Sequence, residues 1–280
     1  MAGTQSLELP GYAVLQYLGS GARSTIWQVR DQQTGEVYAL KRTVRRHASD
    51  GRFLEQAINE YEIGSLLRHP NVRRIFDIRR VSRWLRLHEV HLLMEMCDGL
   101  TVQADRPRDL AAVVRVFTDV ASGLSHLHER NIVHCDTKPN NIVVAGDGSV
   151  KLIDFGQSCY AGTVKSRIQG TPDFIAPEQV YRRPVTARTD VYNFGASLYW
   201  TLTGRPIPTV LPKDGLLTLN DGQRVLPVEQ LNPDVPASLS KLVGECIQLH
   251  PPHRPGSMGE IGSRLMLIGR QLEQARPTGT

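Results

Sequence analysis

The strongest constraint on the fold of this chain is the segment 134–156, which reads H-C-D-T-K-P-N-N-I-V-V-A-G-D-G-S-V-K-L-I-D-F-G. Two short apolar runs, 142–144 and 150–153, flank the turn-forming Ala-Gly-Asp-Gly-Ser, and this pattern predicts a β-hairpin. A hairpin brings its two outer ends together, so we expect Asn141 and Asp154 to lie side by side. Amide and carboxylate oxygens suit Mg²⁺, a hard cation that usually shares its ligands with phosphate. The segment therefore predicts a metal site at the open end of the hairpin.

Asp136 precedes Asn141 by five residues and is expected beside the metal site as a further carboxylate. In that position it can accept a proton from an attacking hydroxyl. Lys138, two residues further on, can steady a phosphoryl group during its transfer. The alternative is that these are ordinary turn residues. The order and separation of the two motifs, H-C-D-T-K-P-N-N at 134–141 and D-F-G at 154–156, make this alternative unfavourable.

The segment resembles the catalytic and metal-binding loops of protein kinases, whose pattern is H-R-D-x-K-P-x-N followed by D-F-G. Cys135 stands where that pattern has arginine. The resemblance extends over about residues 12–270, and the chain is identified as a member of the eukaryotic-like (Hanks-type) Ser/Thr protein kinase family. Its compact length and short insertions resemble bacterial members.

The resemblance implies an α+β, two-lobed protein kinase fold, with a small β-rich N-lobe that carries helix C and a larger, mainly helical C-lobe. We expect one kinase domain over residues 1–280. Its parts are expected to be the N-lobe at about 12–95, a hinge at about 95–99 and the C-lobe at about 100–272, with short tails.

The N-terminal third has the pattern of a β-rich lobe. Residues 12–29 form two alternating apolar segments around a Gly-rich turn, which predicts a hairpin whose backbone can lie close over phosphates. Residues 36–41 end in Lys41 and resemble the V-A-I-K motif, which implies that Lys41 binds phosphates. Helix-like spacing over 52–68 predicts a helix that the following His-Pro-Asn ends.

The resemblance also implies a carboxylate partner for Lys41. Counting back from His69 places Glu60 in that role, with Glu62 as the alternative. Two further strands are expected at 72–81 and 89–96, joined by a basic tip that contains Trp84.

The second of these strands runs into M-E-M-C-D-G, which resembles the hinge of the family, with Met94 as gatekeeper. The implied cofactors are ATP and Mg²⁺ (or Mn²⁺), and the implied metal ligands are Asn141 and Asp154. The implied catalytic group is Lys41, Glu60, Asp136, Lys138 and Thr171. The implied nucleotide site consists of Leu18, Gly19, Ser20, Gly21, Ser24, Ile26, Ala39, Lys41, Met94, Glu95, Met96, Cys97 and Val143.

The remainder of the chain is predicted to be mostly helical. Residues 108–130 form the longest amphipathic segment and predict a core helix. Residues 154–178 show no obvious regular element, 204–236 are expected to be loops with one short helix, and two helices are expected near 237–249 and 257–274.

Three more contacts are implied by the resemblance alone. Thr171, in G-T-P-D-F-I-A-P-E, is expected to bridge Asp136 and Lys138. Glu178 is expected to pair with Arg254, and Asp190 is expected to hold the backbone of the catalytic loop.

Cys135 is the informative departure from the family pattern. In relatives the arginine at this position binds a phosphate on the activation loop, the segment that corresponds to residues 154–178 here. A thiol cannot bind a phosphate in this way. We therefore expect that phosphorylation of Thr163 or Ser166 is not required for activity, although Lys165 and Arg167 can hold a phosphate. Cys135 and Cys159 are also candidates for a disulfide if their Cα atoms lie within about 7 Å; the alternative is two unrelated small apolar residues.

The net charge of +5 has its excess in the first 93 residues, at 41–47 and in the arginines from Arg73 to Arg86. Because no nucleic-acid motif accompanies them, we interpret these arginines as a solvated face. No run approaches ~18 consecutive apolar residues, and the first residues lack a signal-peptide pattern. The four scattered cysteines indicate a reducing compartment, so the expected location is cytoplasmic.

The expected partners are ATP, protein substrates and, for autophosphorylation, a second copy of the chain; nucleic acid and membrane are not expected. Two other classes remain open as alternatives. A catalytically silent pseudokinase scaffold usually lacks a catalytic lysine, aspartate or metal ligand, all present here. A small-molecule phosphotransferase of related fold lacks the A-P-E segment and the lysine at the position of Lys138.

Overall fold

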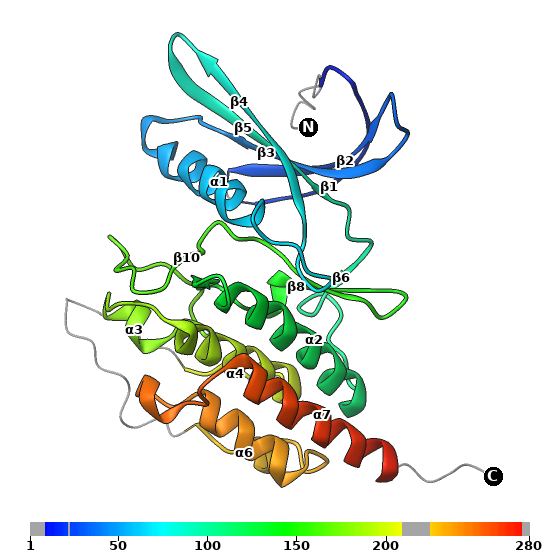
Figure 1. The fold of residues 1–280 in the computed structure, drawn as a ribbon, viewed down its shortest axis with the longest axis vertical. Coiled ribbons are helices and arrows are strands. Elements are labelled where there is room, and N and C mark those ends of the chain that lie inside the picture. Colours follow the sequence, from blue (N-terminus) through cyan, green and yellow to red (C-terminus); the bar gives the residue numbers. More distant parts are fainter. Residues whose placement is uncertain (1–8, 22, 209–224, 276–280) are drawn as a thin grey trace. The chain divides into compact units, whose positions relative to one another are not determined.

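The computed structural model describes residues 9–21, 23–208 and 225–275 (Figure 1). The chain divides into two compact units. Unit 1 comprises the residues up to Arg68 together with Arg73–Asp98, and unit 2 comprises His69–Val72 and the chain from Gly99 onward. The division after Asp98 falls inside the segment expected to be a hinge.

Unit 1 is built on a five-stranded antiparallel sheet with the order β1-β2-β3-β5-β4. Its strands are β1 (Tyr12–Ser20), β2 (Ser24–Asp31), β3 (Val37–Val44), β4 (Ile75–Arg83) and β5 (Arg86–Glu95). A short 3₁₀ turn (Ala48–Asp50) leads into helix α1 (Gly51–Gly64), which packs on β3, β4 and β5. The helix buries Leu54, Ala57 and Ile63 on its apolar face, as its helix-like spacing predicts.

Several expected boundaries in unit 1 were wrong. Strand β3 does not end at Lys41 but continues to Val44, because Arg42, Thr43 and Val44 also pair with β5. Helix α1 ends at Gly64 rather than at the His-Pro-Asn segment, because Gly is a poor helix former and the next turn tightens into bonds from Leu66 to Ile63 and from Leu67 to Gly64. Strands β4 and β5 extend further toward the turn than expected, so the loop between them consists of Trp84 and Leu85 alone. Both residues have positive φ (50° and 62°), the backbone of a two-residue hairpin turn that follows the strand twist.

Unit 2 is mainly helical. Its helices are α2 (Leu110–His128), α3 (Pro177–Val180), α4 (Ala187–Thr203), α5 (Val228–Leu231), α6 (Ala237–Cys246) and α7 (Met258–Ala275), with 3₁₀ turns at Pro139–Asn141 and Pro251–His253. Small sheets join β6 (Gly99–Thr101), β8 (Ile142–Ala145) and β9 (Val150–Leu152), and separately β7 (Ile132–Val133) and β10 (Cys159–Tyr160). The expected short helix within 204–236 is α5, while residues 209–224 of that range lie outside the described residues.

Helix α2 forms the centre of the core in unit 2. It packs against α4 and α7, and Phe117 meets Phe194 edge-to-face at 5.3 Å between ring centroids. Of the described helices, α2 alone is long and apolar enough to cross a membrane, and half of that stretch is buried within the protein. The contacts of α2 are therefore those of a core helix.

The segment 154–178 is more ordered than the sequence predicted. Strand β10 pairs with β7 in the register Cys159 with Val133 and Tyr160 with Ile132, and α3 begins at Pro177. The expectation of a segment without regular structure was therefore wrong at these points. Two residues carry no readable strand periodicity, so only the partner strand reveals β10.

A buried ion pair fastens the end of this segment. Arg254 donates from Nη1 to Glu178 Oε1 at 2.7 Å and from Nη2 to Oε2 at 3.0 Å, and it also donates to three backbone carbonyls. Arg254 and Glu178 are only 3% and 6% exposed. The expected pairing of Glu178 with Arg254 is thus present, and its two-pronged geometry fixes the start of α3 against the turn before α7.

We predict that Arg254→Met destabilises the protein by about 3–5 kcal/mol, because it leaves the Glu178 carboxylate buried without its partner. The measurement is the free energy of unfolding in urea. Arg264→Met is the matched control, since Arg264 pairs with Glu245 at the surface and such pairs contribute about 0–1 kcal/mol. Equal losses for the two variants would contradict the prediction.

Candidate active site

A buried carboxylate on α4 organises the loop that carries the predicted catalytic residues. Asp190 is fully buried. Its Oδ2 accepts hydrogen bonds from the backbone N–H of His134 at 2.8 Å and lies 2.9 Å from His128 Nε2, while its Oδ1 accepts from the N–H of Cys135 at 2.8 Å. These bonds hold Cys135 in the left-handed region (φ 65°), a conformation that costs energy for a residue other than Gly. The loop before Asp136 is therefore fixed by α4, as expected for Asp190.

Asp136, Lys138 and Thr171 are hydrogen-bonded to one another within unit 2, and Asn141 Nδ2 also donates to Asp136 Oδ2 at 3.3 Å. Lys138 Nζ donates to Asp136 Oδ2 at 2.8 Å and to Thr171 Oγ1 at 2.6 Å, and Thr171 Oγ1 donates to Asp136 Oδ1 at 2.9 Å. Asp136 is 6% exposed. The expected bridge by Thr171 is present, and it fixes a carboxylate and a cation at hydrogen-bond distance from each other.

The hairpin of β8 and β9 brings Asn141 close to the D-F-G segment. The strands pair with Ile142 opposite Leu152, and the N–H of Ile153 donates to the carbonyl of Asn141 at 2.9 Å. Asn141 Nδ2 donates to the carbonyl of Asp136 at 2.9 Å, which directs the amide nitrogen toward the loop and leaves the amide oxygen as the atom suited to a cation. Asp154 has a left-handed backbone (φ 66°).

The donor set fits Mg²⁺ better than a metal bound by the protein alone. Among the described residues, no group of three or more His, Cys, Asp or Glu side chains has the geometry to hold a metal ion. Asn141 and Asp154 offer one amide and one carboxylate, the small number of protein oxygens with which Mg²⁺ is held when phosphates complete its shell.

Lys41 and Glu60 are paired in unit 1. Lys41 Nζ donates to Glu60 Oε2 at 2.6 Å, and Glu60 is 2% exposed. The contact is with the carboxylate that the sequence favoured, since the alternative, Glu62, lies exposed on α1. The pair links β3 to α1, so the position of the lysine head depends on how that helix sits on the sheet.

Most of the other residues predicted to bind nucleotide in unit 1 lie along β1, β2, β3 and β5, while Gly21 lies in the turn after β1 and Met96 and Cys97 follow the end of β5. The backbone turns between β1 and β2 with the N–H of Gly21 bonded to the carbonyl of Ser24 at 2.9 Å. Ala39 and the fully buried Met94 are direct partners across β3 and β5. The N–H of Glu95 donates to the carbonyl of Arg74, so an adenine contact at Glu95 must use its carbonyl oxygen.

The predicted residues thus fall into two sets. One set lies in unit 2 and consists of Val143, on β8, together with Asp136, Lys138, Asn141, Asp154 and Thr171. The other predicted residues lie in unit 1.

Gln179 is a site residue that the sequence did not reveal. Its Nε2 donates to the carbonyl of Cys135 at 2.7 Å and to that of Gln169 at 3.2 Å, and its Oε1 accepts from the N–H of Ala176 and from Asn193 Nδ2, each at 3.0 Å. One buried amide therefore joins the catalytic loop, the activation loop and α4. A glutamine directly after A-P-E carries no sequence signal for this role. The second such residue is His128, which the sequence showed only as part of a helix.

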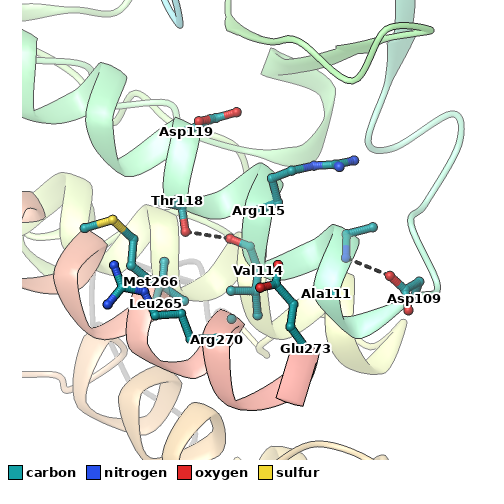
Figure 2. Close-up of a pocket in the computed structure, with 12 residues that line it drawn as sticks. Asp109, Ala111, Val114, Arg115, Thr118, Asp119, Leu265, Met266, Arg270 and Glu273 are labelled. Carbon is teal, nitrogen blue, oxygen red and sulfur yellow. Dashed lines mark hydrogen bonds between the residues drawn. The ribbon is translucent and has the colours of Figure 1, made fainter. Parts of the chain in front are cut away.

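A separate depression lies between α2 and α7, with a volume of about 460 Å³ (Figure 2). Its charged residues are Asp109, Arg115, Asp119, Arg270 and Glu273, and it shares no residue with the predicted site. The hydroxyl of Thr118 donates to the carbonyl of Val114 on the same helix. It is a surface feature distinct from the catalytic set.

Comparisons with known proteins agree with this geometry. A family model described as "Protein kinase domain" matches residues 12–264. The chain is 27% identical over 256 residues to the serine/threonine-protein kinase PrkC of Bacillus subtilis, covering 87% of this chain and 38% of that protein. It is 30% identical over 261 residues to an Aurora kinase of Yarrowia lipolytica, covering 91% and 68%.

A third relative, the probable serine/threonine-protein kinase CA_C1728 of Clostridium acetobutylicum, is 26% identical over 260 residues, covering 89% of this chain and 38% of that protein. The chain therefore spans little more than a third of the length of the two bacterial relatives. From its sequence motifs, the contacts in each unit and the family match over residues 12–264, this chain belongs to the protein kinase family, and the two bacterial relatives carry the name serine/threonine-protein kinase.

Proposed function

We propose that this chain transfers the terminal phosphoryl group of ATP to Ser or Thr hydroxyls of protein substrates, with Mg²⁺ as the metal. The observation that carries the proposal is the set of hydrogen bonds among Asp136, Lys138 and Thr171. The buried carboxylate of Asp190 supports this set, because it binds the backbone N–H groups of the two residues before Asp136. The set presents a carboxylate and an ammonium group at one point, as phosphoryl transfer to a hydroxyl needs.

In this proposal Asp136 orients the substrate hydroxyl and accepts its proton, and Lys138 offsets negative charge on the phosphoryl group during its transfer. Asn141 and Asp154 would hold Mg²⁺, which neutralises charge on the phosphate oxygens when bound. Lys41, kept in place by Glu60, would bind the phosphates. The protein contributes mainly position and electrostatics, with the proton acceptor contributing about 10²–10⁴-fold.

The acceptor class follows from Lys138 and Thr171. A lysine two residues after the carboxylate, joined to a threonine by a 2.6 Å hydrogen bond, resembles the arrangement of Ser/Thr kinases, and the relatives carry that name. The pseudokinase alternative is disfavoured because Lys41 and Asp136 are both present and hydrogen-bonded. Autophosphorylation between two copies of the chain belongs to the same proposal, as does Mn²⁺ in place of Mg²⁺.

We predict that Asp136→Asn lowers the rate of peptide phosphorylation by about 10²–10⁴-fold, because the amide cannot accept the proton of the hydroxyl. The assay follows transfer of labelled phosphate from ATP to a Ser/Thr peptide array and, in parallel, to a panel of metabolites. Asp147→Asn, in the exposed turn between β8 and β9, is the control and should keep its rate. Unchanged transfer by Asp136→Asn would refute the assignment, and transfer to metabolites alone would favour a small-molecule phosphotransferase.

We predict that Glu60→Gln lowers kcat/KM for ATP by about tenfold or more, because a misplaced lysine head binds the phosphates poorly. Glu62→Gln is the matched control on the exposed face of the same helix and should behave like the parent. Steady-state kinetics with varied ATP measure both variants. If Glu62→Gln alone impairs the enzyme, the pairing of Lys41 with Glu60 has no catalytic meaning.

We predict that the double variant Thr163→Ala/Ser166→Ala keeps most of its activity. Cys135 offers no guanidinium to a phosphate on this loop, and the loop is already fastened by β10, Gln179 and the Glu178 pair. Initial rates are compared with those of the unsubstituted chain after phosphatase treatment. Loss of activity in the double variant would show that loop phosphorylation is required.

A further inference from the structure

Two cysteines lie in contact at the junction of the catalytic loop and the activation loop. The sulfur atoms of Cys135 and Cys159 are 3.8 Å apart, although the residues are 24 positions apart in the sequence. Cys135 is buried and Cys159 is half-buried. Among the described residues the other two cysteines, Cys97 and Cys246, are free thiols as well.

The backbone around the pair is held on both sides. Strand β10 places Cys159 opposite Val133 on β7, while Asp190 and Gln179 bind the N–H and the carbonyl of Cys135. The pairing continues just after β10, because the N–H of Ala161 donates to the carbonyl of Asn131, the residue before β7. The sulfur contact therefore arises from the pairing of two defined segments.

The two sulfurs share a small apolar cluster with Val133, Val185 and Ala161. The two sulfur atoms are already in van der Waals contact at 3.8 Å. A disulfide requires Sγ atoms about 2.05 Å apart, so bond formation needs an approach of under about 2 Å.

We propose that Cys135 and Cys159 are a peroxide-sensitive modification site, at which hydrogen peroxide or an organic hydroperoxide forms a reversible disulfide between the catalytic loop and β10. The bond would hold the start of the activation loop on β7. Cys135 occupies the position where the family pattern has arginine. The disulfide would therefore replace the contact between that arginine and a loop phosphate, which Cys135 cannot make.

The chemistry has two balanced steps. The Cys159 thiolate attacks one oxygen of the peroxide, the O–O bond breaks, a sulfenic acid forms, and the departing hydroxide takes up a proton to become water. The sulfur of Cys135 then attacks the sulfenic sulfur as its own proton passes to the leaving hydroxyl, which departs as a second water. The two thiols together lose two electrons and the peroxide gains them.

The surroundings divide the roles of the two sulfurs. The hydrogen bond with Cys135 and the charge of Lys165 together lower the pKa of Cys159 to about 6, against the opposing effect of burial. The hydrogen bond with Cys159, burial and the charge of Asp190 raise the pKa of Cys135. Lys165 on the loop and Asp190 on α4 are the charged groups that act on the pair. The half-buried Cys159 is thus the attacking thiolate, and the buried Cys135 is the resolving thiol.

The experiment uses the whole chain, treated with hydrogen peroxide, alkylated, and digested with trypsin without reduction. The sequence separates the four cysteines into four tryptic peptides, 87–108, 131–151, 152–165 and 242–264. We expect peptide 131–151 linked to peptide 152–165, lighter than their sum by two hydrogen atoms, and its disappearance after dithiothreitol. Because the Cys135 hydrogen bond and Lys165 lower the pKa of Cys159 to about 6, the rate of linkage should rise from pH 5 to 7 and then level off.

Variants separate this site from general oxidation. Cys159→Ser should abolish the link, Cys135→Ser should leave a sulfenic acid on Cys159 that dimedone traps, and Cys97→Ser should keep the full yield of linked peptide. In the oxidised protein, native-state trypsin should cleave after Lys165 several-fold more slowly than in the reduced protein, and Cys159→Ser should lose this difference.

Absence of the linked peptide in the unsubstituted chain would overturn the proposal, as would equal linkage of peptide 152–165 to peptide 87–108 or 242–264. A fold defect in Cys135→Ser does not decide the matter, because Cys159→Ser alters only a half-buried side chain and tests the same bond. The inactive variant Asp136→Asn should form the disulfide as well, so this site stands or falls separately from the proposed kinase activity.

Discussion

The arrangement of unit 2 depends on one buried carboxylate. Asp190 receives two backbone N–H groups and a histidine, and a carboxylate with no solvent contact is tolerable only when its lone pairs are used in this way. These hydrogen bonds offset both the cost of burying the charge and the cost of the left-handed backbone at Cys135. That fixed turn sets where Asp136 points, so the geometry of the predicted catalytic residues follows from Asp190 on α4.

The same principle extends outward from Asp190. Gln179 ties the carbonyl of Cys135 to α3 and α4, and the Glu178–Arg254 pair fastens α3 to the turn before α7. Each of these is a buried polar group with its partners in place, and such networks specify one arrangement because any alternative leaves a polar atom unsatisfied. The contacts that hold the activation loop in unit 2 are thus built from buried polar groups of the chain itself.

Cys135 gives this kinase a different chemistry at a familiar position. An arginine there would present a permanent charge, whereas the thiol packs with Val133 and Val185 in an apolar cluster and meets a second thiol. Replacing a cation by sulfur removes one means of coupling the two loops and creates another. The coupling then depends on oxidation state, because a thiol pair can be joined and separated by electron transfer.

Much of the chemistry was determined by the sequence alone, because it lies in local patterns. The β8–β9 hairpin, helix α2, the lysine on β3 and the order of Asp136, Asn141 and Asp154 all follow from spacing and turn residues that neighbouring positions enforce. The tertiary structure alone decided the end of α1 at Gly64, the two-residue turn at Trp84 and Leu85, the pairing of β10, the place of Gln179 and the contact between Cys135 and Cys159. These features depend on partners that are distant along the chain, and short-range preferences cannot specify a contact whose energy comes from a segment elsewhere in the fold.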